Sequence, residues 1–444
     1  MRAIIFGFVW AGLMGWEAAA ADWPEWRGEG RLGVWAEDGL VESFEDGELK
    51  VLWRAPIGAG YSGPTVAGDF VYAMDRGPDA GAEADVERVL CFDRATGELV
   101  WEHSYGCRYR EVGYPLGPRA SVTIRDGKAY AMGTMGHLHC LNAETGGVVW
   151  ARALSEDYEV AMPIWGLASS PLVEGEVVIV NVGAGENGAA VVGFDKETGE
   201  EMWRRFEDKI GYTSPIVVEQ GGRRVVVVWT GFRIAGLDGV TGKVLWEHET
   251  KPNRMPINVP DPALDEGGEK MLLTTFYDGS RLLALGQEGG AVGVEEVWMR
   301  RGVSEKRTDG LHCMISPPYL YDGHVYGVDS YGQLRCLSLE NGDRLWESVG
   351  EVVPEGRWAT VFMVRNGEDT WMVTERGDLI LSRLSPDGYE EVSRAKLLEP
   401  TTSLRRRGER EPVDVVWSHP AFANRCVYAR NDRELVCVDL SAEP

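Results

Sequence analysis

The sequence predicts an all-β fold, an eight-bladed β-propeller with four-stranded antiparallel blades, closed by N- and C-terminal strands that share one blade. Three observations predict it: a repeat of roughly 49 residues, short strands between tight turns, and the lack of any sustained helical period. The 444 residues include 56 glycines and 17 tryptophans, which suit a chain of many strands and turns. Four short strands in roughly 49 residues are the size of a propeller blade.

The first element is an export signal over residues 1–20. Arg2 precedes an apolar run from Ala3 to Trp16, and alanines at 18–21 offer a small-residue cleavage site. This three-part layout predicts a cleavable signal peptide and a periplasmic or extracellular location. The run is too short to cross a bilayer comfortably, and the first cysteine is Cys91. We therefore expect no transmembrane segment in the mature chain and no lipoprotein anchor.

The repeat itself centres on a turn that is followed by a tryptophan. Five copies pair a glycine with a tryptophan four residues later: Gly97 and Trp101, Gly146 and Trp150, Gly199 and Trp203, Gly242 and Trp246, and Gly342 and Trp346. Asp93, Asp195 and Asp238 stand four residues before three of these glycines. Aspartate can accept backbone N–H bonds, and glycine takes the positive φ that closes a hairpin. These residues therefore predict the turn between the third and fourth strands of a blade.

Other segments complete the blades. Ser-x-Pro or similar segments open five units: YSGPTV from 61, LASSPLV from 167, YTSPIV from 212, MISPPYL from 314 and WSHPAF from 417. Weaker repeat copies end at Trp53 and Trp298, and a degenerate one occupies 381–394. A lone strand at LKVLWRAPI precedes the first full unit, and the chain finishes with three strands. Strands from both termini should share one blade, since this closure removes free sheet edges. Residues 21–444 should form one propeller domain.

The Asp-x-x-x-Gly-x-x-x-Trp element resembles the tryptophan-docking motif of eight-bladed quinoprotein dehydrogenases. It is also similar to pyrroloquinoline-quinone-like (PQQ-like) repeats, including those of BamB-type outer-membrane assembly lipoproteins. The segments DWPEWRGEGRLGVW, GAGYSGPTV and YPLGPRASV resemble a secreted group of these propellers that is common in planctomycete and verrucomicrobial bacteria. The resemblance covers nearly all of the mature chain and implies the fold, whereas fold alone does not imply function.

The resemblance implies two classes of function. The dehydrogenases use a vicinal Cys-Cys disulfide over the quinone, and Glu, Asn and Asp residues around calcium. This sequence has no Cys-Cys pair and no recognisable motif for that site. We therefore expect a non-catalytic binding or assembly scaffold without a cofactor. The alternative is an alcohol or sugar oxidoreductase that depends on PQQ and calcium. A polysaccharide hydrolase or lyase is a third possibility, but it needs paired carboxylates, and only aromatic residues are clear.

The long connections between blades carry the candidate binding residues. Tyrosine, tryptophan and arginine are enriched at binding hot spots, and the connections place these types near one rim: Arg108, Tyr109, Arg110, Tyr114, Arg119, Trp165, Arg254, Arg357, Trp358 and Trp417. In a chain of net charge −25, such a cluster indicates a small anionic or peptide ligand. Packing of the loops would explain the same residues equally well.

Charge limits the class of partner. Net charge −25 argues against nucleic acid or an anionic membrane surface as the main partner. We therefore expect envelope or extracellular proteins as partners. We expect the chain itself to be a monomer. The run RRRGER at 405–410 is expected to be a solvated loop, although it could contact an acidic partner.

Histidines and cysteines carry weaker signals. His137 and His139 share one face of a strand, and His312 adjoins Cys313. Without an evident third ligand we expect ordinary strand residues and no metal. Cys91, Cys140, Cys336 and Cys437 recur at one repeat position and should pack as small hydrophobes. A bridge among Cys107, Cys313 and Cys426 stays open.

Overall fold

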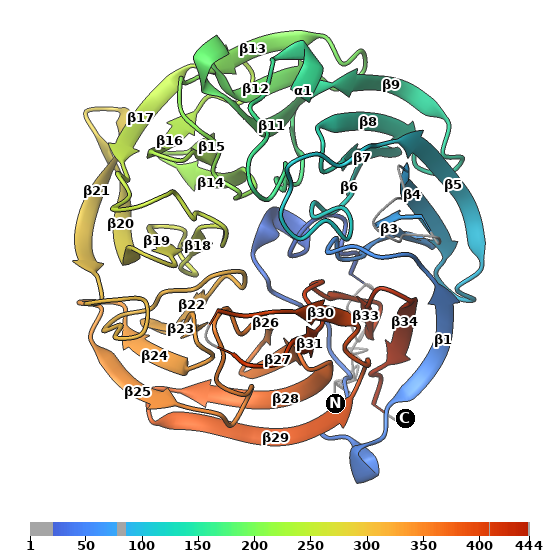
Figure 1. Ribbon diagram of the computed structural model, residues 1–444. Helices are drawn as coiled ribbons and strands as arrows, with labels where there is room; N and C mark the ends of the chain where they lie inside the picture. Colours follow the sequence, from blue (N-terminus) through green and yellow to red (C-terminus); the bar gives the residue numbers. More distant parts are fainter. Residues whose placement is uncertain (1–20, 78–85, 408, 443–444) are drawn as a thin grey trace, which may run out of the picture.

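The computed structural model describes residues 21–77, 86–407 and 409–442 and shows the expected propeller (Figure 1). Eight four-stranded antiparallel sheets surround a central axis. The expected signal peptide at 1–20 lies outside the described residues. Within the described ranges, no helix is both long enough and apolar enough to cross a membrane.

Seven blades follow one another along the chain, each from an innermost to an outermost strand. They are β2–β5 (Thr65–Ala67, Phe70–Arg76, Val86–Asp93, Leu99–Gly106), β6–β9 (Thr123–Arg125, Lys128–Met132, His137–Asn142, Val148–Ala153), β10–β13 (Leu172–Glu174, Val177–Ala184, Ala189–Asp195, Glu201–Arg205), β14–β17 (Ile216–Gln220, Arg223–Trp229, Arg233–Leu237, Val244–Glu249), β18–β21 (Ala263–Leu264, Lys270–Thr275, Gly279–Glu288, Ala291–Arg300), β22–β25 (Tyr319–Tyr321, His324–Val328, Leu334–Ser338, Arg344–Ser348) and β26–β29 (Val361–Asn366, Asp369–Thr374, Asp378–Ser385, Gly388–Lys396).

The eighth blade combines both ends of the described chain. β1 (Lys50–Pro56) forms its outer strand and pairs with β34 (Glu434–Asp439), followed inward by β33 (Cys426–Arg430) and β32 (Ala421–Ala423). The predicted closure by N- and C-terminal strands is therefore confirmed.

Few elements lie outside the blades. They are the hairpin β30–β31 (Thr402–Leu404, Val413–Val415), the one-turn helix α1 (Leu154–Asp157) and short 3-10 turns at Glu29–Arg31, Glu45–Gly47 and Gly185–Asn187.

The repeat tryptophans join neighbouring blades. Trp150 Nε1 donates to the Lys196 carbonyl of the next blade at 2.9 Å, and its ring lies against Gly199. Trp53, Trp101, Trp203, Trp298 and Trp346 make the same kind of bond to a turn in the adjacent blade. Trp246 differs, because it donates to Gln220 Oε1 in its own blade at 2.9 Å. The following blade joins the ten-residue strands β20 and β21 without an Asp-x-x-x-Gly turn that could receive it.

The turn has the chemistry that the repeat predicts. Asp195 Oδ1 accepts hydrogen bonds from the amides of Glu197 and Thr198 at 2.9 and 2.8 Å, and from the Thr198 hydroxyl at 3.1 Å. These bonds favour the ionised carboxylate and lower its pKa. Gly199 closes the turn at φ +70°.

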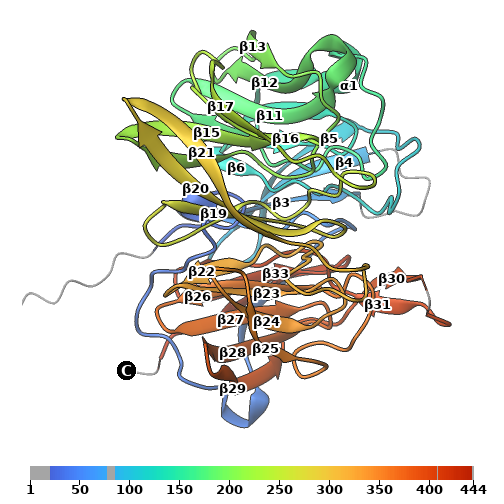
Figure 2. The same ribbon diagram turned by 90° about the vertical axis from the view of Figure 1, so that its left-hand side faces the viewer.

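The segment before β1 crosses one end of the central channel, which the sequence did not predict. Trp23 pairs with Val66 on an innermost strand. Arg31 donates to carbonyls of the segments that lead into β10 and β14, and Glu37 accepts the amides of Asn424 and Arg425 beside β32. This blue segment lies on the opposite face from β30 and β31 (Figure 2). It therefore closes the channel at one end.

Candidate functional site

A cavity of about 150 Å³ lies on the propeller axis. One residue just before the innermost strand of every blade lines it: Tyr61, Arg119, Ala168, Tyr212, Val259, Met314, Trp358 and Trp417. We call this cavity the central cup. Because each blade contributes the same structural position, its walls are fixed by the blades and not by one flexible loop.

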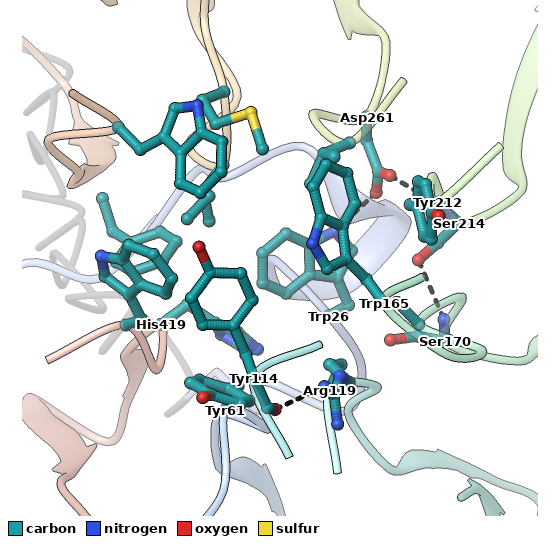
Figure 3. A pocket seen from close by; sticks show the side chains of 17 residues that line it. Trp26, Tyr61, Tyr114, Arg119, Trp165, Ser170, Tyr212, Ser214, Asp261 and His419 are labelled. Carbon is teal, nitrogen blue, oxygen red and sulfur yellow. Dashed lines mark hydrogen bonds between the residues drawn. The ribbon is translucent and has the colours of Figure 1, made fainter. Parts of the chain in front are cut away.

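Aromatic rings form a nearly continuous belt around the central cup (Figure 3). Trp165 packs against Tyr212, with ring centroids 5.0 Å apart, and against Trp358 at 6.2 Å. Tyr114 packs against Trp358 at 6.1 Å and against Trp417 at 5.7 Å. Trp165 and Tyr114 come from two different blade-to-blade connections. These edge and tilted contacts hold the rings without filling the space between them.

Trp26, from the segment that closes the channel, forms the floor of the central cup. Its Nε1 donates to Asp261 Oδ2, and its ring meets that of His419 edge-on at 4.0 Å and 81°. A chain of hydrogen bonds runs round the same level. The Ser121 hydroxyl is hydrogen-bonded to His419 Nε2 (2.7 Å), while the amides of Ser121, Ser170 and Ser214 donate to Ser170 Oγ (2.9 Å), Ser214 Oγ (3.0 Å) and Asp261 Oδ1 (2.7 Å). The floor is thereby tied to five blades.

Burial shifts the titratable groups around the central cup. It lowers the pKa of His419 to about 3, so this imidazole is neutral at pH 7. It raises the pKa of Tyr212 to about 12 and raises that of Tyr61 further, so both phenols stay protonated. Burial also raises the pKa of Asp261, against hydrogen bonds from Ser214 and Trp26 that lower it. The central cup is therefore a mainly apolar, weakly charged site.

Most polar groups of the central cup are already used inside the protein. The Arg119 guanidinium donates to the carbonyls of Gly113, Gly117 and Tyr114, and so holds its own connection in place. Two buried atoms on the wall have no hydrogen-bond partner among the described residues: Tyr61 Oη and Trp358 Nε1. Both atoms are shielded from solvent by their neighbours, so the wall offers a ligand its aromatic faces and not these two donors.

The structure brings together half of the residues predicted for the rim. Tyr114, Arg119, Trp165, Trp358 and Trp417 line the central cup. The rest lie outside its lining: Tyr109 bonds to Glu87 and Thr134, Arg357 pairs with Glu305, Arg254 lies over Tyr277, and Arg108 and Arg110 are exposed. Their role in binding stays a prediction.

Several lining residues were missed by the sequence reasoning, although a signal for some was present. In the five Ser-x-Pro-type segments, the residue three before the proline lines the central cup: Tyr61, Ala168, Tyr212, Met314 and Trp417. Only Trp417 was predicted. Trp26, Asp261 and Phe362 had no such signal, because their position depends on how distant segments meet.

The residues of the central cup do not fit PQQ with calcium. Calcium takes six to eight oxygen ligands, and Asp261 supplies the one carboxylate in the described lining, with both oxygens engaged. All seven cysteines are free, and none has a cysteine as its neighbour in sequence. The donor set for the quinone site is therefore missing from this cavity.

Two further expectations can be compared with the structure. Cys107, Cys313 and Cys426 are free buried thiols in different parts of the propeller, so no bridge links them. The run at 405–410 is not wholly solvated, because Arg406 is buried and forms an ion pair with Glu375.

Comparison with known proteins places the chain in a family. The family model described as outer membrane protein assembly factor BamB matches residues 84–348 and 263–443. The outer membrane protein assembly factor BamB of Shewanella oneidensis is 25% identical over 322 residues, covering 67% of this chain and 70% of that protein.

Two solved structures show the same fold. BamB from Moraxella catarrhalis superposes with a TM-score of 0.59 at 16% identity, covering 89% of this chain and 99% of that one. The quinohemoprotein alcohol dehydrogenase from Comamonas testosteroni superposes with a TM-score of 0.60 at 14% identity, covering 96% of this chain and 81% of that one. With the matched residues spanning most of the sequence, the chain belongs to the PQQ-like β-propeller family whose model is described as outer membrane protein assembly factor BamB.

Proposed function

We propose that this chain is a non-catalytic binding scaffold of the cell envelope, which takes an apolar segment of a protein partner into the central cup. The observation that carries the proposal is the aromatic belt of the central cup, in which Trp165, Trp358 and Tyr114 pack edge to edge around the cavity. The relatives that share the family are named as assembly factors for outer membrane proteins, which supports a protein as the partner.

The chemistry of the central cup favours a peptide over a highly charged ligand. Rigid aromatic walls bind apolar side chains at a small cost in conformational entropy. Arg119 donates to three carbonyls of its own connection, so it is poorly placed to hold a free anion as its main task.

The same residues weigh against the two enzymatic alternatives. A glycosidase needs two carboxyl groups across the scissile bond, whereas the described lining holds Asp261 alone. A quinone-dependent oxidoreductase would need calcium ligands that this set lacks. Export through the segment at 1–20 remains part of the proposal and is tested by N-terminal sequencing of the secreted chain.

The test is selection of a phage-displayed library of random peptides on the purified mature chain. We expect enrichment of peptides with aromatic or large aliphatic residues, and binding that Trp358→Ala weakens at least tenfold. Tyr61→Phe keeps the ring and removes only a hydroxyl that solvent does not reach, so it should leave the affinity unchanged. Phe232→Ala is the matched control, because Phe232 is 36% exposed and is not part of the lining.

Two outcomes would overturn the proposal. Selected peptides that bind the Trp358→Ala protein as well as the unchanged protein would place the binding surface elsewhere. Saturable calorimetric binding of PQQ in the presence of calcium, abolished by Trp165→Ala, would replace the scaffold with the oxidoreductase.

A further inference from the structure

A second cluster of functional side chains lies between the first two blades, away from the lining of the central cup. Glu87 is on β4, Cys107 directly follows β5, and His137 begins β8. One ligand atom from each, a carboxylate oxygen, a thiol sulfur and a ring nitrogen, lie within 4.8 Å of one another. Glu87 and Cys107 are 0% and 1% exposed. A carboxylate, a thiol and an imidazole are thus gathered in a nearly dry place.

An independent observation points to a missing ligand at this place. His137 Nδ1 is buried and has no hydrogen-bond partner among the described residues. Buried polar atoms in folded proteins are normally paired, so an orphan needs an explanation. His103 Nε2 and His139 Nδ1 are unpartnered in the same way, and the rings of these two histidines pack together at 5.0 Å. These two rings lie against Tyr105, which bonds to Glu87, and so they neighbour the three-residue cluster without belonging to it.

The carboxylate is held in one orientation by groups around it. Tyr105 Oη donates to Glu87 Oε2 at 2.8 Å, and the Thr134 amide donates to Glu87 Oε1 at 3.1 Å. The Tyr109 hydroxyl also donates to Oε1. Such outer partners fix the direction of a ligand and leave one of its lone pairs free. Oε2 accepts a bond from Tyr105, and the Cys107 thiol is also hydrogen-bonded to the Glu87 carboxylate, so an ion at this place would replace that thiol proton.

We propose that Glu87, Cys107 and His137 form a binding site for a divalent transition metal ion of the zinc class. Zinc takes thiolate, imidazole and carboxylate ligands at about 2.0–2.3 Å. Tetrahedral ligands at these lengths lie about 3.5 Å apart. Small side-chain rotations that move the three ligand atoms by about 1 Å would therefore bring them into contact with the ion. Three protein ligands leave one position for water or an exchangeable ligand.

The site would also influence the central cup, because one residue connects them. The Thr134 amide bonds to Glu87, while the Thr134 hydroxyl contacts Tyr109 Oη at 2.7 Å and receives a bond from Arg119 at 3.2 Å. Cys107 opens the connection that carries Tyr114 and Arg119 to the central cup. A bound ion would anchor the start of that connection.

The experiment uses the full mature chain, stripped with a chelator and titrated with Co²⁺, whose spectrum reports its ligands. We expect one equivalent to bind, with the thiolate-to-cobalt charge-transfer band of a cysteine ligand, and Zn²⁺ to displace it. Cys107→Ser should abolish the band, and His137→Gln should weaken binding at least tenfold. Cys426→Ser and His248→Gln are the matched controls, since these residues lie outside the cluster.

The readouts keep the proposal falsifiable. His137 is only partly buried, so its variant should still fold if Cys107→Ser does not. Absence of the charge-transfer band in the unchanged protein, or a band and affinity that His137→Gln leaves intact, would overturn the site. Either result would leave the proposal of peptide binding standing, because that proposal rests on the lining of the central cup, which includes none of the three ligands.

Discussion

Gly199→Ala tests how the blades are joined. Gly199 closes the turn of the third full blade at φ +70°, and the Trp150 ring of the preceding blade covers it. A Cβ placed on Gly199 would lie 2.6 Å from Trp150 Cδ2 and 2.7 Å from Cε3. Real Cβ atoms do not approach ring carbons so closely, so the turn or the ring must move.

The expected cost has two parts. A left-handed backbone conformation costs a residue with a Cβ about 1 kcal/mol. Overpacking of a close contact adds about 1–3 kcal/mol. The free energy of unfolding should therefore fall by about 2–4 kcal/mol. Gly127→Ala is a matched control, since Gly127 has φ +71° and no described atom within 4 Å of its Cβ position, so it should cost about 1 kcal/mol.

The assay is urea unfolding followed by far-UV circular dichroism, with midpoints compared at a common slope. In a Trp150→Ala background, Gly199→Ala should lower the free energy of unfolding only as much as Gly127→Ala does, because the ring with which the new Cβ clashes is absent. The double-mutant cycle gives this difference directly as a coupling energy. Equal costs for Gly199→Ala and Gly127→Ala, or strictly additive effects with Trp150→Ala, would refute the docking argument.

Three further predictions concern buried groups around the axis. Burial lowers the pKa of His419 to about 3, against about 6.5 in an unfolded chain. The unfolded chain therefore binds more protons between these values, and stability falls as pH falls from about 6.5. At pH 5 the free energy of unfolding should be about 2 kcal/mol lower than at pH 8 because of His419. The His419→Asn variant should not show this part of the loss. Urea midpoints with the same pH dependence in the variant and the unchanged protein would contradict the prediction. Arg31→Met should cost about 3–5 kcal/mol, since it removes the buried partner that lies 2.7 Å from the Glu25 carboxylate. Arg125→Met, at a partly exposed side chain 3.6 Å from the same carboxylate, should cost under about 1 kcal/mol. Equal melting temperatures for the two variants would rule out the buried pair as an anchor. Trp26→Ala should cost about 2–4 kcal/mol and enlarge the central cup in a crystal structure, and an unchanged cavity would show that Trp26 is not its floor.

The fold could be predicted because its signals are local and repeated. An Asp-x-x-x-Gly turn has the same hydrogen bonds wherever it occurs, as Asp195 and Gly199 show. The missing fourth strand at the end of the chain and the spare strand near Trp53 indicated the closure. Part of the central cup was also within reach, since its wall repeats one position before each innermost strand. Trp417 was predicted from its loop, while Tyr61 and Tyr212 needed the repeat alignment to be followed into the Ser-x-Pro segments.

The sequence by itself determined the number of blades, their turns and the shared eighth blade, because neighbouring residues specify each of these. Only the tertiary structure decided that Trp26 closes the channel beneath the aromatic belt, that Arg119 is occupied by its own connection, and that Cys107 and Glu87 reach His137. These arrangements join residues from different blades, and their distances depend on how the sheets curve round the axis and how long connections pack. No period in the sequence encodes those paths. The floor of the central cup, the bonding of Arg119 and the cluster of Glu87, Cys107 and His137 therefore form only when the ring has closed.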